Sequence, residues 1–166
     1  MEPNFHALQL LAEVALGLLG FSAILIGLAR ADEDGFSPPD SFRVRLLIYS
    51  SLGTMFLALL PFALFNSMHP EDSWRMLNAV LLFYSAIGLS IFPRQFLHLR
   101  ASGFKKIFPL PLLTFQSSIL GINAVLALLM LFDIITLKAN FYVVCLLLFI
   151  IQSAIAFVRT MFYRVH

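Results

Sequence analysis

Charged residues divide this chain into five long apolar runs, and this spacing limits the possible fold more than any other feature. The runs cover residues 7–29, 46–66, 76–93, 107–132 and 139–158. Each is about 18 residues or longer, which is enough for a helix to cross a hydrocarbon core of about 30 Å. Glu13 is the one charged residue inside them. The sequence therefore predicts an all-α, polytopic bundle of five transmembrane helices.

The composition supports this fold class and leaves room for one domain. Hydrophobic residues make up 60% of the 166-residue chain and charged residues 12%, whereas soluble domains carry about 25% charged residues. The longest gap between apolar runs, residues 30–45, is too short for a second folded unit. We therefore expect residues 1–166 to form a single integral-membrane domain. Cys145 is the sole cysteine, so no disulfide can form within the chain.

The first apolar run has one feature of a secretory signal peptide, because Ala29-Arg30-Ala31 has the small-x-small form of a cleavage site. However, no Lys or Arg precedes the run, and the run is longer than the roughly 7–15 residues of a signal-peptide core. We therefore expect an uncleaved first span.

Basic residues are divided unequally between the two ends of the predicted bundle. The second and fourth gaps hold only Arg75 and Lys138. The other nine basic residues follow the first, third and fifth runs: Arg30, Arg43, Arg45, Arg94, Arg100, Lys105, Lys106, Arg159 and Arg164. Positively charged short loops stay in the cytoplasm. This predicts that the N-terminus lies outside and the C-terminus lies in the cytoplasm. Since the rule is strongest in bacterial inner membranes, we also expect a bacterial inner membrane.

Basic residues alternate with Phe and Leu in residues 93–111, a pattern typical of a segment at the membrane surface. We expect Arg94, Arg100, Lys105 and Lys106 to contact lipid headgroups. A nucleic-acid partner is not expected, because the sequence contains no folded nucleic-acid-binding module. Near the other end, Trp74 and Tyr142 are predicted to face the membrane interface, where aromatic residues gather.

The first run carries a stripe of small residues. Gly17, Gly20 and Gly27 share one helix face with Glu13, because successive members of this set are four, three and seven residues apart. Glycines on such a face predict a close helix–helix contact. A carboxylate at this depth is costly, so Glu13 should face protein or a watery cavity.

Glu13, Tyr84 and Asn123 form a candidate intramembrane polar site. Counted at about 1.5 Å per residue from the predicted outer ends, they lie at similar depths, and Tyr84 and Asn123 are hydrogen-bond donors. The cluster is either a structural hydrogen-bonded contact or a site that handles protons or cations. Contact of Glu13 with another subunit or with a lipid headgroup is a further alternative.

A second polar layer is predicted in the inner half of the spans. It includes Ser50, Thr54, Gln116 and Gln152. Uncharged polar residues of this kind line a narrow hydrated path or join helices by hydrogen bonds, and joining is the commoner use.

Catalytic chemistry finds little support. The four histidines lie in end or loop segments, and no His-Glu-x-x-His motif is present. We therefore expect a non-enzymatic protein with no metal ion and no cofactor.

Three functions are compatible with these features. The first is an oligomeric pore or channel-like protein. The alternative is a membrane subunit or sensor that docks a cytoplasmic partner through residues 30–45 and 94–106. The third is a membrane-embedded enzyme that acts on lipid. The expected partners are the lipid bilayer and either a second copy of the chain or another membrane protein.

Overall fold

The computed structural model describes residues 3–31 and 37–162, which form five helices and no strand. They are α1 (Phe5–Ala31), α2 (Pro38–Ser67), α3 (Pro70–Ala101), α4 (Leu110–Leu131) and α5 (Lys138–Phe162). Each helix is long and apolar enough to cross a membrane. The predicted all-helical fold, with five helices long and apolar enough to span a membrane, is therefore confirmed.

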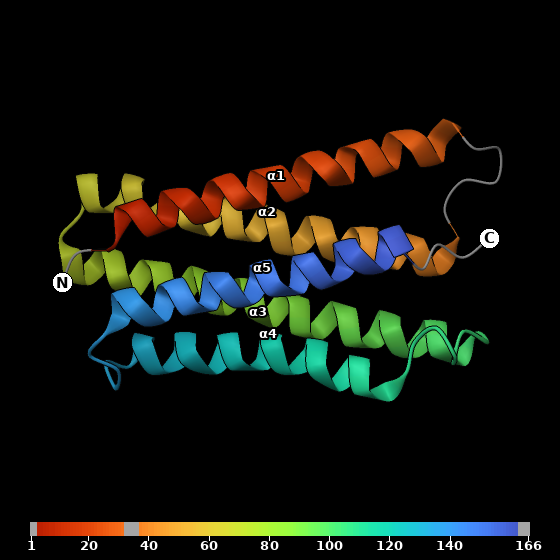
Figure 1. Ribbon diagram of the computed structural model, residues 1–166. Coiled ribbons are helices and arrows are strands. Elements are labelled where there is room, and N and C mark those ends of the chain that lie inside the picture. Colours follow the sequence, from red (N-terminus) through yellow and green to blue (C-terminus); the bar gives the residue numbers. More distant parts are fainter. Residues whose placement is uncertain (1–2, 32–36, 163–166) are drawn as a thin grey trace.

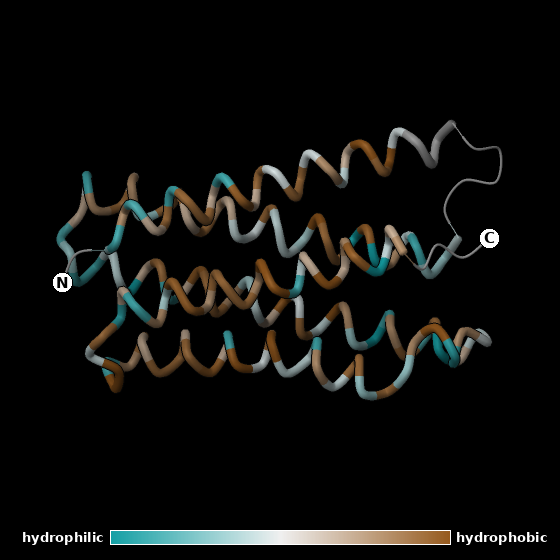
Figure 2. The backbone as a smooth tube through the Cα atoms, in the orientation of Figure 1, coloured by the Kyte–Doolittle hydropathy of each residue, from teal (hydrophilic) through white to brown (hydrophobic). Residues whose placement is uncertain are grey.

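The five helices lie side by side along one common direction (Figure 1). α1 packs against α2 and α5, while α3 packs against α4 and α2, and α5 also contacts α2 and α4. α1 and α4 consequently lie on opposite sides of the bundle (Figure 1). Apolar residues occupy most of the length of each helix, and hydrophilic residues are concentrated towards the two ends (Figure 2).

The basic residues whose side chains are described divide between the ends of the bundle as the sequence predicts. We call the end where α2 begins and α3 and α5 finish the basic end. Its described basic side chains are Arg43, Arg45, Arg94, Arg100, Lys105, Lys106 and Arg159. Arg75 and Lys138 lie at the opposite end.

α2 and α3 extend beyond the apolar runs that predict them. α2 begins at Pro38, and the side chain of Ser37 caps it by accepting a hydrogen bond from the Asp40 backbone N–H at 3.4 Å. Proline fits this first turn because the N–H groups there have no acceptor within the helix. α3 continues to Ala101, so Arg94 lies on a helix rather than in a loop.

Trp74 and Tyr142 are buried between helices, and the prediction that they face the membrane interface is wrong. Trp74 is 4% exposed and Tyr142 is fully buried. The Tyr142 hydroxyl donates to the Leu57 carbonyl at 2.8 Å. The Trp74 ring meets the rings of Phe65 and Tyr142 edge-on. The Tyr142 ring packs against the Trp74 ring, and its hydroxyl is hydrogen-bonded inside the bundle, so neither the ring nor the hydroxyl needs the membrane interface.

Two tyrosines join α2 to α3. The rings of Tyr49 and Tyr84 stack with centroids 4.3 Å apart and planes 12° apart. Each hydroxyl donates to the backbone carbonyl of the other tyrosine. The Tyr84 ring lies over Gly53, and the Tyr49 ring lies over Gly88. A Cβ atom at Gly53 would overlap the Tyr84 ring, and a Cβ atom at Gly88 would lie only 2.9 Å from the Tyr49 hydroxyl, so glycine suits both positions.

A short internal repeat encodes this contact. Residues 46–53 read Leu-Leu-Ile-Tyr-Ser-Ser-Leu-Gly, and residues 81–88 read Leu-Leu-Phe-Tyr-Ser-Ala-Ile-Gly. Five of the eight positions are identical. The two segments lie on adjacent helices that run in opposite directions. Each tyrosine therefore meets the glycine of the other copy, and the contact has the symmetry of a two-fold axis.

We predict that Gly53→Ala destabilises the protein by about 1–3 kcal/mol, because the new methyl group overlaps the Tyr84 ring. A matched control is Gly121→Ala, where a Cβ atom meets nothing within 4 Å. Both changes increase helix propensity equally, so thermal melts in detergent report the difference in packing. Equal melting temperatures for the two variants would contradict the prediction.

Candidate functional site

Glu13 lies on the outside of the bundle. Its side chain is exposed on α1, and its Oε1 accepts a hydrogen bond from Nε2 of Gln9 at 3.0 Å. It lies eight residues after Phe5, the first residue of α1, which corresponds to about 12 Å along the helix axis. A carboxylate and an amide therefore lie together on an outward face, well inside an apolar helix.

The structure does not bring the three residues of the candidate polar site together. The Tyr84 hydroxyl donates to the Tyr49 carbonyl at 2.6 Å. Asn123 is fully buried on α4, on the other side of the bundle from α1. Similar depth did not produce contact, because α1 packs against α2 and α5. The partner of Glu13 is Gln9, which its spacing of four residues on one helix would have indicated.

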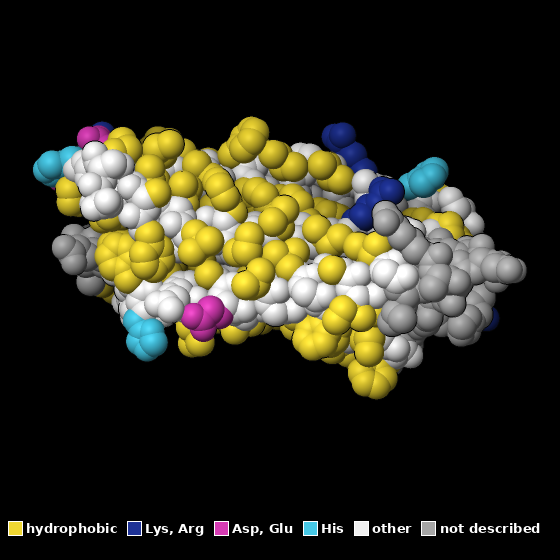
Figure 3. All heavy atoms as spheres, turned by 90° about the horizontal axis from the view of Figure 1, so that it is seen from above, with side chains coloured by type: hydrophobic (Ala, Val, Ile, Leu, Met, Phe, Trp, Pro, Cys, Tyr) yellow, Lys and Arg dark blue, Asp and Glu magenta, His cyan; other side chains and the backbone are white. Residues whose placement is uncertain are grey.

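Gly17, Gly20 and Gly27 also face outwards. All three are exposed, and a Cβ atom built on any of them meets no atom within 4 Å. No helix of the described bundle uses this stripe as a contact. We call Gln9, Glu13 and the three glycines the outer face of α1. Figure 3, which views the molecule from the side of α1, shows hydrophobic side chains over the middle of the surface and most of the visible Lys and Arg towards one end.

The inner polar layer is packed between helices. Ser50, Thr54 and Gln152 are fully buried, and Gln116 is 8% exposed. The Thr54 hydroxyl donates to the Ser50 carbonyl at 2.8 Å, within α2. The hydroxyls of Ser51 and Ser153 are hydrogen-bonded at 2.9 Å and join α2 to α5. A cavity of about 10 Å³ beside Gln116 holds one water molecule at most.

Several buried polar side chains lack a hydrogen-bond partner among the described residues. They belong to Ser50, Asn78, Ser85, Asn123 and Gln152. Asn78 lies eight residues from the start of α3, and Asn123 lies eight residues from the end of α4. The two amides are therefore at similar levels on packed helices. A buried polar group that stays unpaired costs roughly 1–3 kcal/mol.

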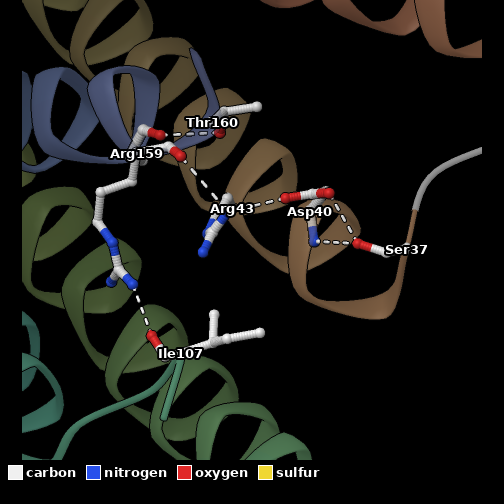
Figure 4. A network of polar contacts seen from close by, with 7 residues as sticks. Ser37, Asp40, Arg43, Ile107, Arg159 and Thr160 are labelled. Atoms are coloured by element: carbon white, nitrogen blue, oxygen red, sulfur yellow. Dashed lines mark hydrogen bonds and ion pairs between the residues drawn. The ribbon is translucent and has the colours of Figure 1, made fainter. Parts of the chain in front are cut away.

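A polar network ties the helices together at the basic end (Figure 4). Arg43 is 3% exposed, and its Nη1 donates to Oδ1 of Asp40 at 2.8 Å and to the Arg159 carbonyl at 3.4 Å. The other Asp40 oxygen accepts from the Ser37 hydroxyl at 2.7 Å. Arg159 Nη2 donates to the Ile107 carbonyl at 2.7 Å. The network joins α2, α5 and the segment before α4, and none of its residues was a predicted site residue.

The four predicted headgroup contacts lie at the basic end. Arg94, Lys105 and Lys106 are exposed, whereas Arg100 is half-buried and donates from Nη1 to the Phe108 carbonyl at 2.8 Å. Contact with lipid headgroups stays a prediction for these residues. Arg94 also lines an open cleft of about 540 Å³ between α2 and α3.

Metal-ligating residue types do not form a cluster in the described part of the chain. No group of three or more His, Cys, Asp or Glu residues there lies close enough to hold a metal ion. At the end opposite the basic end, Lys138 donates a hydrogen bond to Asp133, and this contact lowers the pKa of the exposed Asp133 carboxyl.

Comparison with known proteins gives no relative: no protein family, curated protein or solved structure matches this chain.

Proposed function

We propose that this chain is a non-enzymatic integral membrane protein whose subunits associate through the outer face of α1. The position of Glu13 carries the proposal. Its carboxylate is exposed about 12 Å along an apolar helix, where contact with lipid hydrocarbon is costly. A protein partner that supplies hydrogen bonds removes this cost.

The glycines supply the space that such a partner needs. Gly17 and Gly20 are one turn apart and Gly27 lies two turns further on, and all three are open. Small residues allow two helix backbones to approach closely, which strengthens van der Waals contact in a membrane. Lipid chains form less van der Waals contact with such a face than a closely packed helix does.

A second copy of the chain fits the outer face of α1 well. The Gln9 amide uses one N–H on the Glu13 carboxylate of its own helix. The amide has a second N–H, and the carboxylate can accept further hydrogen bonds. In a two-fold contact, each Gln9 then donates to the Glu13 of its neighbour, and both copies gain equally.

We predict that Gly20→Leu converts the oligomer to monomer. The leucine fills the space for a neighbouring backbone and should weaken association about tenfold or more. The monomer should keep its melting temperature, because Gly20 is exposed and a Cβ atom there meets no atom of the subunit within 4 Å. Light scattering in detergent measures the mass, with Gly121→Leu on α4 as the matched control. A monomeric wild-type protein, or an unchanged mass for Gly20→Leu, would exclude this contact.

A cation path along α1 is the second candidate function. The inner polar layer is packed between helices, so it does not line a path within one subunit. Gln9 and Glu13 are instead accessible on the outer face of α1, which favours a path between subunits. Copies of α1 around a common axis would place a ring of carboxylates in the membrane, and such rings select cations.

We predict that Glu13→Gln separates assembly from conduction. Glutamine keeps the shape and hydrogen-bonding capacity of glutamate but removes the charge. The mass of the oligomer should be unchanged. If α1 lines a path, cation flux through liposomes should fall at least tenfold in this variant. If liposomes that contain the wild-type protein show no cation flux, the cation path is eliminated and association of subunits remains as the proposed function.

The basic end faces the cytoplasm in the proposed arrangement, with a bacterial inner membrane as the setting. The support is the division of basic residues, nine against two, between the two sets of loops. The N-terminus then lies outside and the C-terminus inside.

This orientation predicts the labelling of introduced cysteines in intact cells. In a Cys145→Ser background, Arg75→Cys should react with a membrane-impermeant thiol reagent added outside, and Ser102→Cys should not. Both positions are exposed at opposite ends of α3, so accessibility within the protein is matched. Lysed cells, in which both cysteines should react, provide the control. The reverse pattern would invert the topology.

A further inference from the structure

A cleft with basic walls opens at the basic end, between the first turns of α2 and the last turns of α3. Its volume is about 540 Å³, which lies within the range of about 300–1,000 Å³ for small-molecule sites. Phe42, Pro38 and Leu99 provide apolar surface. The polar lining comes from Ser41, Arg45, Arg94, Gln95 and His98.

The other arginines with described side chains at this end are engaged in structural contacts. Arg43 binds Asp40, and Arg100 and Arg159 donate to backbone carbonyls. Arg45 and Arg94, in contrast, are exposed and make no hydrogen bond or ion pair within the described part of the chain. Two available guanidinium groups therefore line one cleft from different helices. Guanidinium groups match phosphate oxygens in both charge and geometry.

Apolar surface continues from both arginines towards the middle of the bundle. Leu52 and Phe56 lie about two and three turns along α2 from Arg45, on the same helix face. Ile91 lies about one turn along α3 from Arg94. All three apolar side chains are between 42% and 54% exposed. The cleft is therefore the charged end of an apolar track that runs into the membrane-spanning region.

We propose that this cleft binds one anionic glycerophospholipid. Arg45 and Arg94 hold its phosphate from opposite walls, and its acyl chains follow the exposed track on α2 and α3. Phe42 forms the buried floor, where its ring meets those of Phe92, Phe96 and Phe108 edge-on. The Asp40 carboxylate does not repel the phosphate, because Arg43 neutralises it inside the bundle.

The test compares lipids that share the same acyl chains. Full-length protein in detergent is equilibrated with equal amounts of phosphatidylglycerol and phosphatidylcholine, and retained lipid is counted by native mass spectrometry. We expect the wild-type protein to retain one phosphatidylglycerol. In Arg45→Gln/Arg94→Gln, the preference for phosphatidylglycerol should fall about tenfold or more. A melting curve in phosphatidylcholine checks the fold of this variant, whose changes lie at exposed positions.

Lys105→Gln/Lys106→Gln is the matched control, because it removes two exposed charges from the same end but outside the cleft. This control should keep the preference within about twofold of wild type. An equal loss of the phosphatidylglycerol preference in both double variants would show that general surface charge causes the preference, and would overturn the proposed lipid site. Excess inorganic phosphate should leave the retained lipid in place. Displacement by phosphate would show a small-anion site and overturn the assignment to lipid.

Discussion

Hydrocarbon offers no hydrogen bonds, and the rest of this structure depends on that constraint. Every polar group within the spans has to find a partner in the protein or remain unpaired at a cost. Hydrogen bonds within the five helices pair the backbone N–H and C=O groups of the spans. Several buried side chains then donate additional hydrogen bonds to backbone carbonyl oxygens. Tyr49, Tyr84 and Tyr142 donate to carbonyls of neighbouring helices. At the basic end, Arg159 donates to the Ile107 carbonyl in the segment before α4. These hydrogen bonds to backbone carbonyls therefore join α2 to α3 and to α5, and α5 to the segment before α4.

The sequence predicts the five spans because charge is excluded from hydrocarbon at every residue of a span, which leaves a strong signal in composition. Helix ends are less predictable. α2 begins eight residues before its apolar run, because Ser37 and the following prolines start a helix that continues beyond the hydrocarbon. The pattern of charges also predicted which residues share an end of the bundle, since chain direction alternates with each span.

The candidate site was harder to predict, because depth along a helix does not determine which neighbour a side chain faces. Glu13, Tyr84 and Asn123 have similar depths, but α1 contacts neither α3 nor α4 extensively. Trp74 and Tyr142 likewise have the right depth for an interface, yet both point into the bundle. Two local features of the sequence do indicate contacts that the structure contains. They are the spacing of four residues between Gln9 and Glu13, and the repeat that pairs Tyr49 with Tyr84. Neighbour choice depends on packing of all five helices together, which composition does not encode.

The contact between the two repeats has a consequence for biogenesis. Only Met68 and His69 separate α2 from α3, and Tyr49 and Tyr84 are 35 residues apart, so closing this helical hairpin costs little chain entropy. Synthesis proceeds from the N-terminus, and α1 packs against α2 as well. It follows that α1, α2 and α3 can assemble in the bilayer before the ribosome has completed α4 and α5. The final helix, α5, then closes the bundle by packing against α1, α2 and α4.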